Sequence, residues 1–160
     1  MKPTPTRMLL DTNIFIIGVA YPESPEAAIL SWLGYGQNVS RETEVMISQE
    51  LIEQILRVGK RLHGKDWGSA ILSRLWNDLN LVYVTIPPEA YEQVRKDGNI
   101  PREDIDVYLA ALAGQSQCFV SSNHVLVKAL VKLTGEFECL TPQEVHQNLF
   151  LMTDRWHYIL

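Results

Sequence analysis

The stretch MLLDTNIFI, residues 8–16, places a single aspartate between two apolar segments. The first segment is predicted to end a short buried strand at Leu10, and the second is predicted to begin a helix near Ile14. Two interpretations of Asp11 follow. Asp11, with Thr12 and Asn13 after it, caps the helix. Alternatively, the carboxylate lies at the carboxyl end of a strand because the protein uses it there.

Short apolar segments alternate with helical patterns over the rest of the chain. Strands that are apolar on both faces and separated by helices are typical of a parallel sheet covered on both sides. We therefore predict an α/β fold, in which ligands bind beyond the carboxyl ends of the strands. The predicted strands are residues 7–10, 44–47, 81–86, 117–121 and 137–140, and the predicted helices begin near residues 14, 27, 48, 66, 87, 103, 123 and 141.

The composition indicates one globular domain. The chain has 160 residues, of which 46% are hydrophobic, and this is enough for a sizeable core. We predict a single domain over residues 1–160, with its core at 7–150 and a C-terminal tail at 151–160. Because no apolar segment has the length of a membrane span and the N-terminus has no apolar signal-peptide core, we expect a soluble, cytoplasmic protein that does not bind a membrane. Cys118 and Cys139 lie in predicted strands and are expected to be reduced core residues.

The formal net charge of −5 argues against a general polyanion binder that relies on a basic surface. A protein of this charge that acts on nucleic acid needs a local basic patch or a bound metal ion. The most apparent basic cluster contains Arg57, Lys60 and Arg61. This cluster is either a solvated helix end or a surface that steers a substrate.

Carboxylates and amides gather near the predicted strand ends. Several carboxylates brought together repel one another, and a hard divalent cation such as Mg²⁺ or Mn²⁺ resolves the repulsion. Such an ion activates water and stabilises the transition state of phosphodiester cleavage. Each residue also has a simpler interpretation as a helix cap, a first-turn acid or a solvated helix position. The candidates are Asp11, Glu50, Glu53, Gln54, Asp104, Asp106 and Asn123.

Segments in this order resemble the motifs of the PIN-domain family. LLDTNIFI (9–16) resembles its opening motif, a hydrophobic strand that ends in Asp-Thr-Asn, and ISQELIEQILRV (47–58) resembles its second. REDIDVYLAALAGQSQCFVSSNHVL (102–126) resembles the third and fourth motifs, and ECLTPQEV (138–145) resembles the close of the domain. The likeness runs from about residue 7 to residue 150.

The resemblance implies a three-layer α/β/α sandwich with a central parallel sheet. It also implies a Mg²⁺- or Mn²⁺-dependent endoribonuclease that cleaves RNA. Members of the family are often the toxin of a toxin–antitoxin pair and often homodimers, so an antitoxin protein is an expected class of partner.

The resemblance further assigns roles to individual residues. Asp106 takes the place of the third-motif acid, with Asp104 as a nearby substitute, and Thr12 and Ser121 support the site or contact the substrate. The implied catalytic residues are Asp11, Glu53, Asp106 and Asn123, and the implied metal ligands are Asp11, Glu53, Asp104 and Asp106.

The second motif departs from the family pattern. Counted from Ser48, the usual acid position falls on Gln54, and Glu53 precedes it by one residue. One residue rotates a side chain by about 100° around a helix, so Glu53 and Gln54 cannot face a metal ion equally. Either Glu53 is the ligand, or a neutral amide occupies the position. Because Asn123 is neutral as well, the second case predicts weak metal binding and reduced activity.

Three hypotheses follow from the sequence. The first is an active metal-dependent ribonuclease. The second is a catalytically weak PIN-like domain that binds RNA or a protein partner, and it is suggested by Gln54, Asn123 and the acidic charge. The third is a nucleotide-binding α/β protein, which requires a glycine-rich phosphate loop after a strand. Gly34-Tyr35-Gly36 lacks the residues that complete such a loop.

Overall fold

The central element is a five-stranded parallel sheet with the strand order β3-β2-β1-β4-β5. The computed structural model describes residues 5–37, 42–133 and 137–147, and the predicted tail at 151–160 lies outside these residues. The sequence-based prediction of a parallel sheet is confirmed. The strands are β1 (Arg7–Leu10), β2 (Glu44–Ser48), β3 (Leu81–Val84), β4 (Cys118–Val120) and β5 (Glu138–Leu140).

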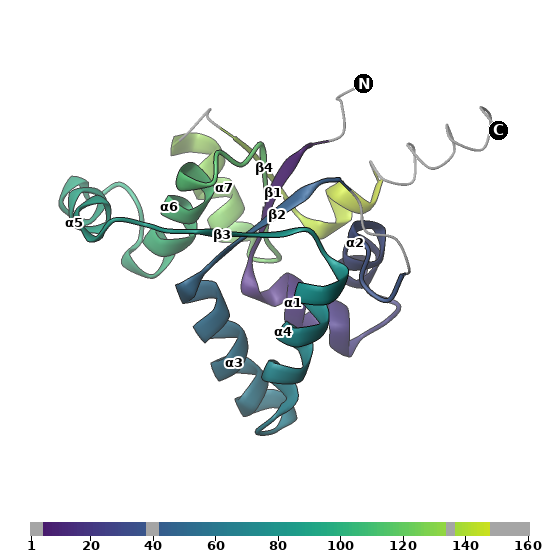
Figure 1. Cartoon of the computed structure of the whole chain (residues 1–160). Coiled ribbons are helices and arrows are strands. Elements are labelled where there is room, and N and C mark those ends of the chain that lie inside the picture. Colours follow the sequence, from purple (N-terminus) through teal and green to yellow (C-terminus); the bar gives the residue numbers. More distant parts are fainter. Residues whose placement is uncertain (1–4, 38–41, 134–136, 148–160) are drawn as a thin grey trace.

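Helices connect the strands and cover both faces of the sheet (Figure 1). None of the helices within the described ranges is long and apolar enough to cross a membrane. The helices are α1 (Thr12–Ala20), α2 (Pro25–Leu33), α3 (Gln49–His63), α4 (Trp67–Asp78), α5 (Pro88–Asp97), the 3-10 turn η1 (Arg102–Asp104), α6 (Ile105–Ala113) and α7 (His124–Leu133), followed by helical residues at 142–147.

Alternation along β1 places its side chains in two different clusters of the core. Met8 and Leu10 pack on one face of the sheet with apolar residues of α1, α2 and α4. Leu9 points to the other face and packs with residues of α6 and α7. Each of these three side chains is at most 1% exposed, and burying one contributes about 1.5–3 kcal/mol. The three-layer α/β/α arrangement follows from this two-sided burial.

Both cysteines belong to this core, as predicted. Cys118 in β4 and Cys139 in β5 are buried residues. Burial raises the pKa of the Cys139 thiol to about 11. The reactive form of a cysteine is the thiolate, so Cys139 is an inert packing residue at neutral pH.

Some element boundaries differ from the sequence-based prediction. The strand predicted at 81–86 ends at Val84, because Val84 pairs with Ser48, the last residue of β2 before α3 begins. The helix predicted from residue 103 begins at Ile105, because η1 forms the preceding turn through the bond from Asp104 N to Pro101 O. The helix predicted near Ile14 begins two residues earlier, at Thr12, immediately after its capping residue.

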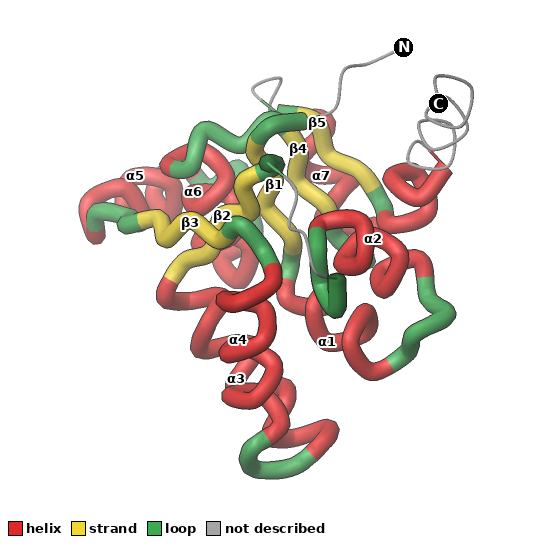
Figure 2. Tube along the Cα trace, turned by 45° about the vertical axis from the view of Figure 1, so that its right-hand side comes forward, coloured by secondary structure: helices red, strands yellow, loops and turns green. Residues whose placement is uncertain are grey.

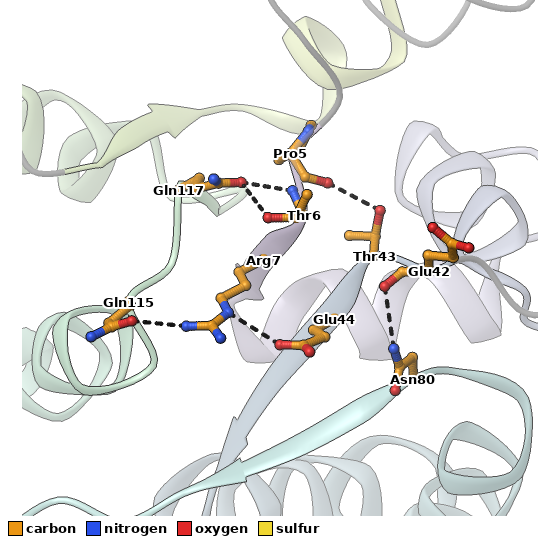
Figure 3. A network of polar contacts seen from close by, with 9 residues as sticks. All are labelled: Pro5, Thr6, Arg7, Glu42, Thr43, Glu44, Asn80, Gln115 and Gln117. Atoms are coloured by element: carbon orange, nitrogen blue, oxygen red, sulfur yellow. Dashed lines mark hydrogen bonds and ion pairs between the residues drawn. The ribbon is translucent and has the colours of Figure 1, made fainter.

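The amino-terminal ends of the strands are joined by a network of polar contacts (Figure 3). The Arg7 Nε atom lies 3.2 Å from Glu44 Oε2, and Arg7 Nη1 donates to Gln115 Oε1 at 2.9 Å. Thr43 Oγ1 donates to the Pro5 carbonyl at 3.0 Å. Because the Arg7–Glu44 pair is partly exposed, it contributes only about 0.2–1 kcal/mol. The polar contacts at this end of the sheet therefore join neighbouring strands.

Helices α3 and α4 form a hairpin and lie side by side in Figures 1 and 2. They approach most closely at two glycines, Gly59 and Gly68. A Cβ atom on Gly68 would lie 3.1 Å from the Ile55 carbonyl oxygen and 3.1 Å from Leu56 Cα. A Cβ atom on Gly59 would lie 3.2 Å from Gly68 Cα. Since these neighbours are backbone atoms, the close approach of α3 and α4 depends on the glycines.

We expect Gly68→Ala to destabilise the protein by about 1–3 kcal/mol, because the added methyl group forces the two helices apart. The melting temperature would fall by about 2–4 °C for each kcal/mol. Thermal unfolding followed by circular dichroism measures this change, and Ser69→Ala, at an exposed neighbouring position, is the control. A Gly68→Ala protein that melts with the wild type would contradict the close packing of α3 on α4.

Candidate functional site

Asp11 lies at the carboxyl end of β1 and is held from two directions. Its Oδ1 atom accepts a hydrogen bond from the Thr12 backbone N–H at 2.8 Å, which makes it the N-cap of α1. Its Oδ2 atom accepts from the Ser121 hydroxyl at 2.8 Å, and Ser121 is fully buried. Both interpretations of Asp11 therefore apply. The residue caps a helix, and its half-buried carboxylate is fixed at the edge of the sheet where ligands bind in parallel α/β folds.

A second chain of hydrogen bonds links this junction to α3. The Thr12 hydroxyl, which is 6% exposed, donates to the Gln54 side-chain oxygen. The Gln54 side-chain amide then donates to Glu50 Oε1 at 3.2 Å. Glu50 and Gln54 are four residues apart, so they lie on one face of α3, one turn from each other. The helix therefore presents Glu50 and Gln54 towards the end of β1.

Two further carboxylates reach this region from the start of α6. Burial, followed by the charges of Glu103 and Asp11, raises the pKa of Asp104. Burial, followed by the charge of Glu50, raises the pKa of Asp106. Asp104 occupies the N-cap position of α6 without a side-chain capping bond. Neither carboxyl group is used as a cap, and each is close enough to another acid to feel its charge.

The acids form two neighbouring pairs, Asp11 with Asp104 and Asp106 with Glu50. Within the described ranges, no group of three or more histidine, cysteine or acidic side chains is arranged to surround one ion. The donors are nonetheless carboxylate oxygens, which are the ligands that Mg²⁺ and Mn²⁺ prefer. Charge repulsion within each pair is what a bound cation would relieve. The chemistry of the donor atoms therefore fits a hard divalent cation, and their arrangement in the metal-free structure does not yet enclose one.

Some residues implied by the family resemblance lie away from these pairs. Glu53 is exposed, and its Oε1 atom accepts a hydrogen bond from Gln49 at 3.3 Å. The exposed Asn123 caps α7, because its Oδ1 atom accepts from the Leu126 backbone N–H at 3.2 Å. The Asn123 backbone N–H donates to Ser121 Oγ at 3.0 Å, so it supports the residue that holds Asp11.

The basic cluster lies further along α3. Arg57, Lys60 and Arg61 are exposed, and the last two belong to the final turn of the helix. At a rise of about 1.5 Å per residue, Lys60 lies about 15 Å along the helix from Glu50. Positive charges at the end of a helix also complement its dipole. These residues therefore do not contact the carboxylate pairs.

One contact near the site, between Glu26 and Ser122, was not predicted from the sequence. Glu26, interpreted as a first-turn acid, is only 6% exposed, and its Oε1 atom accepts from the Ser122 hydroxyl at 3.0 Å. This bond joins α2 to the loop after β4, and no sequence pattern signals it. The position of Glu50, in contrast, could have been predicted from its spacing of four residues from Gln54. A residue four positions before Gln54 shares its helix face, so a helix with Gln54 at the site brings Glu50 there too.

Comparison with known proteins supports the fold. No protein-family model matches the chain, and no curated protein matches it. A chain in the crystal structure of VapBC2 from Rickettsia felis, bound to a promoter DNA fragment, is similar with a TM-score of 0.59 and 15% identity over 84% of this chain and 98% of that chain. A chain of VapBC-1 from nontypeable Haemophilus influenzae is similar with a TM-score of 0.56 and 14% identity over 86% and 98%. At these identities the likeness concerns the three-layer architecture, which spans most of both chains.

Proposed function

Because the chain has a PIN-like α/β/α fold, we propose that it is a divalent-metal-dependent endoribonuclease. One observation carries the proposal. Asp11 is fixed by Thr12 and Ser121 at the carboxyl edge of the sheet, where its charge acts on the half-buried Asp104 and where Thr12 is linked through Gln54 to Glu50 of α3. Repelling carboxylates at a ligand-binding edge are typical of a site that functions with a cation.

Asp11, Asp104 and Asp106 would hold the ion in this proposal, and their side chains would have to turn towards it, since no three such side chains of the described residues surround one point in the metal-free structure. A bound Mg²⁺ or Mn²⁺ supplies an activated water and stabilises charge on the phosphodiester transition state. Ser121 and the Thr12 N–H fix the orientation of Asp11, so its carboxylate does not need to reorganise during the reaction. Burial of Asp104 and Asp106 reduces competition from solvent around their oxygens.

RNA is the proposed substrate, because the ordered motifs resemble a family of ribonucleases. Along the axis of α3, Arg57, Lys60 and Arg61 lie about 10–17 Å from Glu50, estimated from the helical rise. They would attract the RNA chain beyond the cleaved bond, and this effect would weaken as ionic strength rises.

A protein partner and self-association belong to the same proposal. Two similar solved structures are of VapBC2 and VapBC-1, and the motif resemblance implies an antitoxin that restrains the nuclease. We propose that this chain binds such a partner and forms a homodimer. Co-expression with the protein encoded beside it, followed by light scattering, measures both associations.

The function is tested with purified full-length chain and a labelled single-stranded RNA. We expect cleavage with millimolar Mn²⁺ or Mg²⁺ and none with excess EDTA. Single-stranded DNA of the same sequence is the substrate control. Addition of Mn²⁺ at about 100 times its dissociation constant would stabilise the fold by about 2.7 kcal/mol. Absence of both cleavage and metal-dependent stabilisation would reject the proposal.

A catalytically weak domain that binds RNA or a protein is the second candidate. It is favoured by the neutral Gln54 at the family's acid position and by the use of Asn123 as a helix cap. Calorimetric titration with Mn²⁺ separates the two candidates. Failure to bind at millimolar Mn²⁺ favours the weak domain, and binding favours the nuclease.

A further inference from the structure

The hydrogen-bond chain from Thr12 through Gln54 to Glu50 uses both ends of the Gln54 amide. The oxygen accepts from the Thr12 hydroxyl, and the NH₂ group donates to Glu50 at 3.2 Å. An ionised carboxylate at position 54 could accept from Thr12 but could not donate to Glu50. It would also place a like charge one helical turn from Glu50, which is unfavourable. The neutral amide therefore suits its neighbours in this chain.

Among the acids on α3, Glu50 is the one directed towards the site. It is half-buried and bonded to Gln54, whereas Glu53 is exposed and bonded to Gln49. The charge of Glu50 also contributes to the raised pKa of Asp106 on α6. Glu50 is thus bonded to Gln54 on its own helix and is close enough to Asp106 for their charges to interact.

We propose that Glu50 supplies the metal-binding carboxylate of α3, and that Gln54 is a positioning residue that holds Glu50 through its hydrogen bonds to Thr12 and Glu50. This inference rests on the proposed metal-dependent function. It implies that the metal-binding acid of α3 lies one helical turn closer to the start of the helix than in the family pattern. Gln54 occupies the position where that pattern has the acid. The Gln54 amide is then a working part of the site, and its presence does not indicate a loss of activity.

Calorimetric titration of the full-length, metal-free chain with Mn²⁺ tests the inference. We expect Glu50→Gln to weaken Mn²⁺ binding at least about tenfold, as the loss of one ligand or its orienting partner does. Glu53→Gln removes the alternative acid of α3 and should leave the affinity for Mn²⁺ within about twofold of the wild type. The glutamine at position 50 keeps the size of glutamate and can still accept from Gln54, so the fold is maintained.

A double-mutant cycle tests the positioning role. Gln54→Met keeps the length of the side chain and removes both hydrogen bonds, and we expect it to weaken Mn²⁺ binding about three- to tenfold. If Gln54 acts through Glu50, adding Gln54→Met to Glu50→Gln has no further effect. If Gln54 binds the ion itself, the two losses are additive. Melting temperatures of the metal-free variants verify that each is folded.

The outcomes separate this inference from the proposed function. If the wild type binds Mn²⁺ and Glu50→Gln binds it equally well, the role of Glu50 is rejected and the nuclease proposal stands. If Glu53→Gln causes the larger loss, the acid is Glu53 and our assignment is wrong. Additive losses reject the positioning role of Gln54. A wild type that binds no Mn²⁺ rejects both the inference and the proposed function.

Discussion

Asp11→Asn is expected to lower Mn²⁺-dependent RNA cleavage by about a thousandfold, the scale on which one charge-stabilising group contributes to an active site. The change removes the charge at the end of β1 and keeps the shape of the side chain. The asparagine oxygen can still accept from the Thr12 N–H, because asparagine is as good an N-cap as aspartate. Its NH₂ group can donate to the Ser121 oxygen in place of the present bond.

Initial rates of RNA cleavage measure this effect, together with Mn²⁺ titration of the same preparation. Asp97→Asn is the control, since Asp97 is an exposed aspartate at the end of α5. Thermal unfolding should show that the Asp11→Asn protein is folded, with a melting temperature close to that of the wild type. Cleavage at the wild-type rate would exclude Asp11 from the mechanism.

The sheet and the place of Asp11 could be predicted because they depend on local patterns. A strand that is buried on both faces must have apolar residues throughout, and the first polar residue marks its end. This reasoning located β1 and its boundary at Leu10. Asp104 and Asp106 were placed at the start of α6 by the helical pattern that follows them, and burial, followed by the charges of neighbouring acids, raises the pKa of each.

The orientation of α3 could not be predicted in the same way. A helix can rotate about its axis, and a rotation of about 100° exchanges adjacent residues at a given position. Packing sets the rotation of α3 about its axis. Leu51 and Ile55 are buried, and this fixes the directions in which the other side chains of the helix point. Glu50 and Gln54 then face β1, and Glu53 faces solvent. This choice depends on tertiary contacts that a sequence motif does not contain.

The function of Asn123 shows a second limit. The sequence placed it after β4, and the structure agrees, with the residue directly before α7. An asparagine at this place can bind an ion or cap a helix, and here its side-chain oxygen accepts the Leu126 N–H. Local sequence specifies the junction, but the hydrogen-bond geometry determines how the side chain is used.

Asp106→Asn is expected to stabilise the metal-free protein at neutral pH while lowering RNA cleavage by at least about a hundredfold. Burial and the charge of Glu50 raise the pKa of Asp106 above its ordinary value of 3.8. The folded protein therefore holds this proton more tightly than the unfolded chain does. The resulting stability is present below the ordinary pKa and is lost as the pH rises through the folded-state pKa.

The difference in melting temperature between the wild type and Asp106→Asn should consequently depend on pH and on bound metal. Well below pH 3.8, where the carboxyl group is protonated in both the folded and the unfolded chain, the wild type and Asp106→Asn should melt together if both remain folded. At pH 7 the variant should melt about 1–3 °C higher, a modest rise because the site is partly solvated. Millimolar Mn²⁺ should reverse the order, because the wild type gains more binding free energy than the variant. A variant that is less stable than the metal-free wild type at pH 7 would mean that Asp106 forms a favourable ionised contact, and the repulsion argument for a cation at this edge would fail.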